Sequence, residues 1–162
     1  MDAQRRPTGT GPVPGTPAVP GTGPVVGPGR SLFDGEQIGA DETVSHQYAI
    51  PLRLPGYRSL PLSCIDSLTV TIDGDRVTAD RTSLDLNAHR YPTTLLCSFP
   101  DVWWFALDPA AVLVALDEPL DPGPHTVTGE LVTRDPHRPD EALPYTYSAT
   151  SVLRVGGDAP DP

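Results

Sequence analysis

The residues that could carry chemistry in this chain are few, and the four histidines are the first to consider. His46, His89, His125 and His137 are scattered, and none forms the His-x-His or His-x-x-x-His spacing that presents two ligands to one metal ion. The sequence therefore predicts no metal ligands in this chain. A catalytic site that gathers His46, His89 or His125 from separate strands is an open alternative, which metal analysis of the purified protein would test.

Nucleophilic catalysis would require an activated serine or cysteine. The most suggestive serine, Ser63, lacks the flanking glycines of the G-x-S-x-G turn that exposes such a nucleophile. Cys64 directly precedes Ile65 at the start of an apolar segment, a position typical of buried and unreactive thiols. We therefore expect no catalytic residue in this chain.

Trp103 and Trp104 are adjacent, so on a strand their side chains point to opposite faces. We expect one ring to fill the core and the other to project outward. An outward tryptophan is typical of a sugar-stacking platform or of an anchor in a subunit interface. The alternative is that the domain itself covers both rings.

The stretch from Leu54 to Ile65 connects two predicted strands and is too apolar for an ordinary surface loop. Pro55 and Pro61 stiffen it, and Tyr57 and Arg58 add an amphipathic ring and a guanidinium with five donors. Apolar connections of this kind are commonly covered by another surface. We predict an interaction site here; packing across the end of its own domain is the alternative.

The elements that must position these residues are predicted to be β-strands. The chain holds 21 Pro and 15 Gly, and interior prolines break helices. Alternation of apolar and polar residues, together with short segments bounded by Pro, Gly and Asp, predicts strands over residues 43–54, 65–72, 84–86, 94–98, 102–107, 112–116, 125–133 and 144–155. Asp73-Gly74 predicts a tight hairpin after the second of these. Pro51 would remove a ladder hydrogen bond, which places the first strand at a sheet edge or a bulge.

Seven or eight short, regularly spaced strands predict an all-β fold, an antiparallel β-sandwich. Residues 1–30 contain seven Pro, seven Gly and no aromatic residue, which predicts a disordered Pro/Gly-rich N-terminal arm. The sandwich domain is predicted over residues 31–156, and residues 157–162 are expected to form a frayed tail.

Charge excludes several classes of partner. The formal net charge is −10 and every cationic side chain is an arginine. Nucleic acids and anionic membrane surfaces bind clustered cations, so neither is expected as a partner. No apolar run approaches the roughly 20 residues that span a bilayer, and no secretory signal is recognisable. We expect a cytoplasmic protein with reduced thiols.

Four motifs occur in order along the chain. They are the Tyr-Arg-Ser-Leu-Pro-Leu-Ser-Cys-Ile run of residues 57–65, Asp73-Gly74, Trp103-Trp104, and the Pro-Gly-Pro-His turn of residues 122–125. In these motifs and their order the chain resembles the beta subunit of bacterial C-glycoside deglycosidases. The resemblance covers most of residues 44–155.

The resemblance implies that this chain is a non-catalytic accessory subunit without a cofactor of its own. Its partner would be a larger TIM-barrel alpha subunit that holds a divalent metal and cleaves the carbon–carbon bond of 3-oxo-C-glycosides. The residues implied to dock on that partner are Tyr57, Arg58, Leu60, Pro61, Leu62, Trp103 and Trp104. The alternative function is a stand-alone β-sandwich module that binds carbohydrate or another protein.

Overall fold

The computed structural model describes residues 31–41, 43–55, 59–135, 137 and 144–156. The predicted arm of residues 1–30 and the predicted tail of residues 157–162 lie outside this part of the chain. The described residues form eleven β-strands and three short 3₁₀ helices. The all-β class is confirmed, but the predicted count of seven or eight strands was too low.

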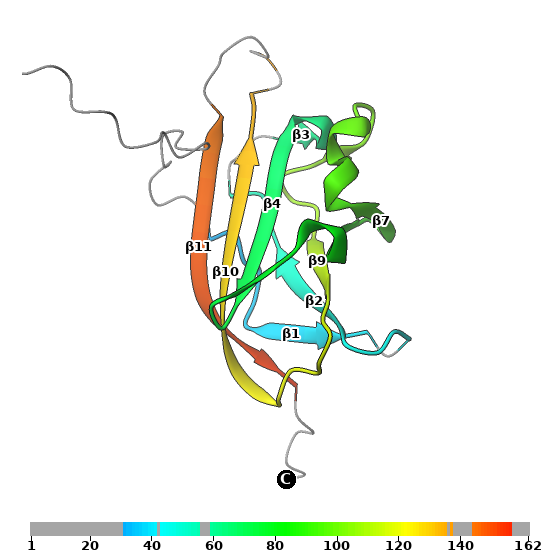
Figure 1. Cartoon of the computed structure of the whole chain (residues 1–162). Helices are drawn as coiled ribbons and strands as arrows, with labels where there is room; N and C mark the ends of the chain where they lie inside the picture. Colours follow the sequence, from blue (N-terminus) through cyan, green and yellow to red (C-terminus); the bar gives the residue numbers. More distant parts are fainter. Residues whose placement is uncertain (1–30, 42, 56–58, 136, 138–143, 157–162) are drawn as a thin grey trace, which may run out of the picture.

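One group of strands forms a strongly paired antiparallel layer. β4 (Ile65–Ile72) and β11 (Tyr145–Val155) flank β10 (Gly123–Thr133), and β5 (Asp75–Val77) adds the edge beside β4. Figure 1 shows β11, β10 and β4 side by side as long, twisted strands.

A second group forms the facing layer. β2 (Gln47–Leu52) pairs with β9 (Ala110–Ala115), which pairs with β6 (Thr82–Leu86), which in turn pairs with β7 (His89–Pro92). All of these pairings are antiparallel. In Figure 1 this layer lies to the right of β4.

The short strand β1 (Gln37–Ala40) joins the two layers into one curled, nine-stranded sheet. It runs parallel to β11, with Gln37 opposite Arg154, and antiparallel to β2, with Gly39 opposite Ala49. β1 crosses beneath the two layers in Figure 1, where the sheet turns the corner. The sandwich is therefore a folded-over sheet, in which four residues provide the bend.

The remaining elements are a short ribbon and three 3₁₀ helices. β3 (Leu60–Pro61) and β8 (Trp103–Trp104) form a separate two-stranded ribbon. The 3₁₀ helix η1 (Leu62–Cys64) leads from β3 into β4. The other 3₁₀ helices are η2 (Ala79–Arg81) and η3 (Thr93–Ser98), and η3 packs beside η1.

The core fills the space between the two layers with alternate residues of each strand. Val70, Val127 and Leu153 face inward from one layer, and Ile50 and Leu84 from the other, each without exposed surface. Burial of such a side chain stabilises the fold by about 1.5–3 kcal/mol.

The segment before β1 also enters the core. Leu32 and Phe33 are buried against Gly129 of β10, where a Cβ atom added to the glycine would lie 2.9 Å from Leu32 Cδ2 and 3.0 Å from Phe33 Cζ. Gly129 is needed for this close approach, because any larger residue would push the two side chains away.

Two sequence predictions agree closely with the structure. The strand predicted over residues 65–72 is β4, and Leu68, Val70 and Ile72 are buried as the alternation predicts. The Asp73-Gly74 hairpin is confirmed between β4 and β5, with φ of 51° at Asp73 and 89° at Gly74. The left-handed backbone at both positions matches the twist of the flanking strands.

Two local predictions were wrong. Residues 94–98, predicted to be a strand, belong to the 3₁₀ helix η3, in which Leu96 is buried and Leu95 is exposed. The strand that contains Pro51 was predicted at a sheet edge or a bulge, whereas β2 lies between β1 and β9 and pairs with β9 in an unbroken register. Pro51 is tolerated there because its backbone faces the segment before β1 and not a regular strand. Asp34 N donates to Pro51 O, and no ladder hydrogen bond on that side requires an N–H from residue 51.

Candidate partner-binding surface

The β3–β8 ribbon brings together two motifs that are far apart in the sequence. Leu60 lies opposite Trp104, and Pro61 lies opposite Trp103. Leu62 N donates a hydrogen bond of 2.8 Å to Val102 O, which extends the pairing by one rung. The apolar connection and the tryptophan pair are therefore one structural unit.

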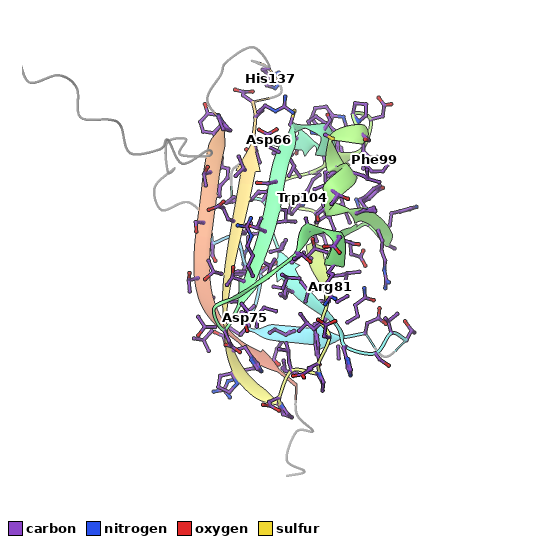
Figure 2. The ribbon with its side chains drawn as sticks, viewed as in Figure 1. Asp66, Asp75, Arg81, Phe99, Trp104 and His137 are labelled. Carbon is purple, nitrogen blue, oxygen red and sulfur yellow. The ribbon has the colours of Figure 1, made fainter. Side chains whose placement is uncertain are left out.

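The inner side of this ribbon is part of the core. Trp104 has no exposed surface, and its indole Nε1 donates to Asp108 O at 3.2 Å. Leu60 and Leu62 are buried in the same cluster. Figure 2 shows Trp104 between the two layers. A buried indole with a satisfied N–H fixes the ribbon on the domain.

The outer side carries three exposed apolar side chains at every second position. Trp103 is 39% exposed, Phe105 54% and Leu107 83%. The rings of Trp103 and Phe105 stack, with centroids 6.5 Å apart and planes inclined by 21°. We refer to Trp103, Phe105 and Leu107 as the apolar row.

Hydrogen bonds on both sides hold the backbone of the apolar row in place. Ala106 N donates to Ser59 Oγ at 3.0 Å, and Asp108 N donates to Phe105 O at 2.9 Å. The carboxylate of Asp108 in turn accepts from Asn87 Nδ2 at 3.0 Å, in the β6–β7 turn. The row is therefore presented by a fixed turn, which lowers the entropy lost when a partner covers it.

The predicted interface residues fall into three sets. Tyr57 and Arg58 lie outside the described residues. Leu60, Pro61, Leu62 and Trp104 are covered by the chain itself. Trp103 is exposed, which confirms that the two tryptophans point to opposite faces and identifies the outward one. The docking role that the sequence predicts for these residues stays a prediction.

Sequence reasoning missed Phe105 and Leu107. Both lie within the strand predicted over residues 102–107, of which only Trp103 and Trp104 pair with a neighbour. The signal was present in the alternation of Trp103, Phe105 and Leu107, which places all three on the face opposite Trp104.

Arg134, which directly follows β10, holds η1 and the start of β4 in place. Arg134 Nε lies 2.7 Å from Asp66 Oδ1, and its guanidinium donates to Ser63 O at 3.2 Å. Arg134 N also donates to Cys64 O at 2.8 Å. Asp66 and His137 lie toward the same end of the molecule in Figure 2. These contacts fix the turn that follows the Leu60–Leu62 stretch.

The two thiols are free. Cys64 is half-buried and Cys97 is exposed. Desolvation by burial raises the pKa of the Cys64 thiol, only partly offset by the nearby Arg134 guanidinium. A raised pKa disfavours the thiolate, which is the nucleophilic form. The chemistry of Cys64 is therefore that of a core residue.

The histidines have separate partners in the structure. His89 Nδ1 lies 3.0 Å from Asn87 O in a hairpin turn, whereas His125 lies between Asp73 and Asp121. Within the described ranges, no three His, Cys, Asp or Glu side chains lie together in a way that could hold a metal ion. Among those same residues, no helix has the length and apolar character to cross a membrane.

Comparison with known proteins agrees with the resemblance seen in the motifs. The profile of the C-glycoside deglycosidase beta subunit family matches residues 36–137. A 3'-dehydrocarminate deglycosidase beta subunit from a Microbacterium species is 34% identical over 74% of this chain and 88% of its own length. A C-glycoside deglycosidase beta subunit from Microbacterium trichothecenolyticum is 34% identical over 61% of this chain and 75% of its own length. Another, from Arthrobacter globiformis, is 32% identical over 66% of this chain and 76% of its own length. The chain belongs to the C-glycoside deglycosidase beta subunit family.

Proposed function

We propose that this chain is the non-catalytic beta subunit of a C-glycoside deglycosidase and assembles with a larger alpha subunit. In this proposal the alpha subunit is a TIM barrel that holds a divalent metal and the acid and base groups. It cleaves the carbon–carbon bond between a 3-oxo sugar and its aglycone. The complex is placed in the cytoplasm, where the thiols of Cys64 and Cys97 stay reduced.

The observation that carries the proposal is the apolar row beside the family's Leu-Pro-Leu stretch. An exposed tryptophan, a phenylalanine stacked on it and a leucine that is 83% exposed present apolar surface to water on one fixed turn. Removal of apolar surface from water is the dominant favourable contribution to most protein association. Aromatic side chains at the centre of an interface also contribute most of its binding energy.

The buried side of the β3–β8 ribbon fixes the position of the apolar row. Trp104 and Leu62 have no exposed surface, so the strand that carries Trp103 cannot shift without opening the core. A contact surface that is already ordered costs little side-chain and backbone entropy on binding. This supports a permanent subunit contact centred on the outer side of β8.

Reconstitution tests this function. The chain and the alpha subunit encoded with it are purified separately, then assayed alone and mixed, with a 3-oxo-C-glycoside as substrate and release of the aglycone as the readout. We expect both separate subunits to be inactive and the mixture to be active, with one species of summed mass by light scattering. Full activity of the alpha subunit alone would overturn the proposal.

A stand-alone carbohydrate-binding module is the second candidate, because the exposed Trp103 ring is also a surface on which a sugar can stack. Tryptophan fluorescence separates the two functions. Titration of the isolated chain with free glycans would shift the emission of Trp103 if it binds sugar, and Trp103→Phe would abolish the shift while buried Trp104 still reports on folding. We expect no shift with glycans and a clear shift with the alpha subunit.

A further inference from the structure

His125 lies at the start of β10 with an acceptor at each ring nitrogen. Its side chain is 11% exposed. Nδ1 lies 2.6 Å from Asp73 Oδ2, and Nε2 lies 2.7 Å from the carbonyl oxygen of Asp121. A neutral imidazole has one N–H and one lone pair, so it could satisfy only one of these contacts. The doubly protonated ring satisfies both.

Asp73 is in the ionised form that this arrangement needs. Its Oδ1 accepts the backbone N–H of Thr126 at 2.8 Å, while Oδ2 faces His125. The hydrogen bond from His125, followed by the one from Thr126, lowers the pKa of this carboxyl. Both carboxylate oxygens therefore accept, and the proton belongs to the ring.

The ring joins three backbone segments. Asp73 begins the left-handed turn between β4 and β5, and its N donates to Thr126 O at 2.8 Å. Asp121 lies in the connection that enters β10, and His125 itself lies on β10. We propose that His125 is a protonated latch, which ties the β4–β5 turn to the connection before β10 and releases that connection when the ring loses its proton. This inference is independent of the proposed function.

Loss of the proton must break one of the two contacts. The bond to the Asp73 carboxylate is the stronger, because hydrogen bonds to a charged acceptor are about twice as strong as those to a neutral one. The carbonyl of Asp121 is therefore the contact that is given up. The connection before β10 is thereby released, and the hairpin contact remains.

The charged groups around the ring favour its protonated form. Asp73 and Asp121 both attract the imidazolium, and Asp75 follows on β5. In the pairing of β10 with β11, Leu153 lies opposite His125, and the cation Arg154 lies opposite Pro124. The acceptor carbonyl of Asp121, and then the Asp73 carboxylate, raise the pKa of His125 above its ordinary value of 6.5.

The two segments that the latch joins lead into the walls of an open hollow of about 540 Å³. One wall runs from Asp75 to Arg81, just after Asp73, and the other from Ala115 to Asp117, just before Asp121. The exposed ion pair of Arg81 and Asp117, at 2.7 Å, also crosses between these walls. Figure 2 labels Asp75 and Arg81, which lie at the two ends of the first wall. After release of the latch, the connection before β10 is still held by this surface ion pair and by the hydrogen bond of 2.8 Å from Leu120 N to the Tyr48 hydroxyl.

The sign of the pH dependence follows from the raised pKa. A group whose pKa is higher in the folded state contributes its full stabilisation below the unfolded pKa of about 6.5. That contribution is lost as the pH rises through the folded pKa of His125. The latch is therefore closed in mildly acidic solution and opens as the pH rises through the raised pKa of His125.

Nitrogen NMR of histidine-labelled full chain tests the latch directly. We expect both ring nitrogens of His125 to be protonated near pH 6.5, with titration above this value. We also expect the amide protection of Leu120, whose N–H donates to the Tyr48 hydroxyl next to Asp121, to fall in the same transition, by about tenfold for each unit by which the pKa is raised. A ring that is neutral near pH 6.5, or unchanged protection through its titration, would overturn the proposal.

Two variants sharpen this test. Asp73→Asn removes the charged acceptor and is expected to move the His125 titration to lower pH. Asp75→Asn, from the same hairpin, is the matched control and is expected to move it much less. Equal shifts in both variants would mean that general charge, and not the contact of Asp73 with the ring, sets the titration, and would contradict the latch.

Discussion

The indole ring of Trp103 stacks on the phenyl ring of Phe105, 6.5 Å between centroids, on the outer side of the strand whose inner side buries Trp104. One short strand thus separates a structural tryptophan from an exposed one. Substitutions on its two sides should therefore have different consequences, on folding in one case and on assembly in the other.

Trp104→Ala is expected to destabilise the domain strongly. The side chain is fully buried, and loss of a large aromatic side chain from a core costs about 3–5 kcal/mol. Its indole also donates to Asp108 O, so the turn that carries the apolar row loses a contact. Thermal unfolding followed by circular dichroism measures the change. A melting temperature within a degree or so of the wild type would contradict this packing.

Tyr48→Phe is expected to cost about 1 kcal/mol of folding stability. The Tyr48 hydroxyl accepts the backbone N–H of Leu120 at 2.8 Å, which ties the connection after β9 to β2. Tyr91→Phe is the matched control, because the Tyr91 ring is held by an edge contact with Phe99 that a phenyl ring retains. Urea unfolding measures the free energy of unfolding of both variants. Equal losses of stability would mean that the hydrogen bond of Tyr48 is not the cause.

Gly129→Ala is expected to destabilise the fold by about 1–3 kcal/mol through overpacking. The new methyl group would lie 2.9 Å from Leu32 Cδ2 and 3.0 Å from Phe33 Cζ. Gly39→Ala is the control on β1, since a methyl group there would lie 3.6 Å from Ala49 Cβ, an ordinary contact. If the two variants unfold at the same denaturant concentration, the packing of Phe33 on β10 is not as described.

Ala88→Gly is expected to stabilise the domain by about 0.5–1 kcal/mol, because the left-handed conformation is strained for an alanine and not for a glycine. Asn87 and Ala88 form the two-residue turn between β6 and β7, with φ of 52° and 63°. Ala111→Gly within β9 is the control and is expected to have the opposite sign. Destabilisation by Ala88→Gly would count against this turn.

Much of the strand pattern could be predicted because it is encoded locally. Alternation from Ile65 to Ile72 and the Asp73-Gly74 signal specify one hairpin without reference to the rest of the chain. Adjacency of Trp103 and Trp104 was likewise enough to predict that the rings point to opposite faces, whereas the exposure of Trp103 required the structure.

The elements that were missed depend on distant partners or weak turn signals. β1 is four residues long, and its parallel pairing with β11 joins opposite ends of the domain, which no local pattern specifies. The Asn87-Ala88 turn lacks the usual glycine, so β7 was not predicted. Residues 94–98 carry adjacent leucines without alternation, and here packing against η1 selects a 3₁₀ helix.

The candidate site was predicted in part. The sequence indicated the Leu60–Leu62 stretch and the tryptophan pair as separate features, and their pairing in one ribbon required the structure. Exposure of Phe105 and Leu107 could not be read from their types, since apolar residues after a strand are more often buried.

The affinity of the alpha subunit for variants of the apolar row measures whether this row forms the subunit interface. We compare Phe105→Ser/Leu107→Ser with Val152→Ser, which replaces an apolar residue on β11 that is 57% exposed, close to the 54% of Phe105. Both variants should fold as the wild type does, because the replaced side chains lie at the surface. If the apolar row is the interface, we expect at least about a tenfold loss of affinity for the double variant, as for residues at an interface centre. We expect wild-type affinity for Val152→Ser. Wild-type affinity of the double variant would contradict this interface.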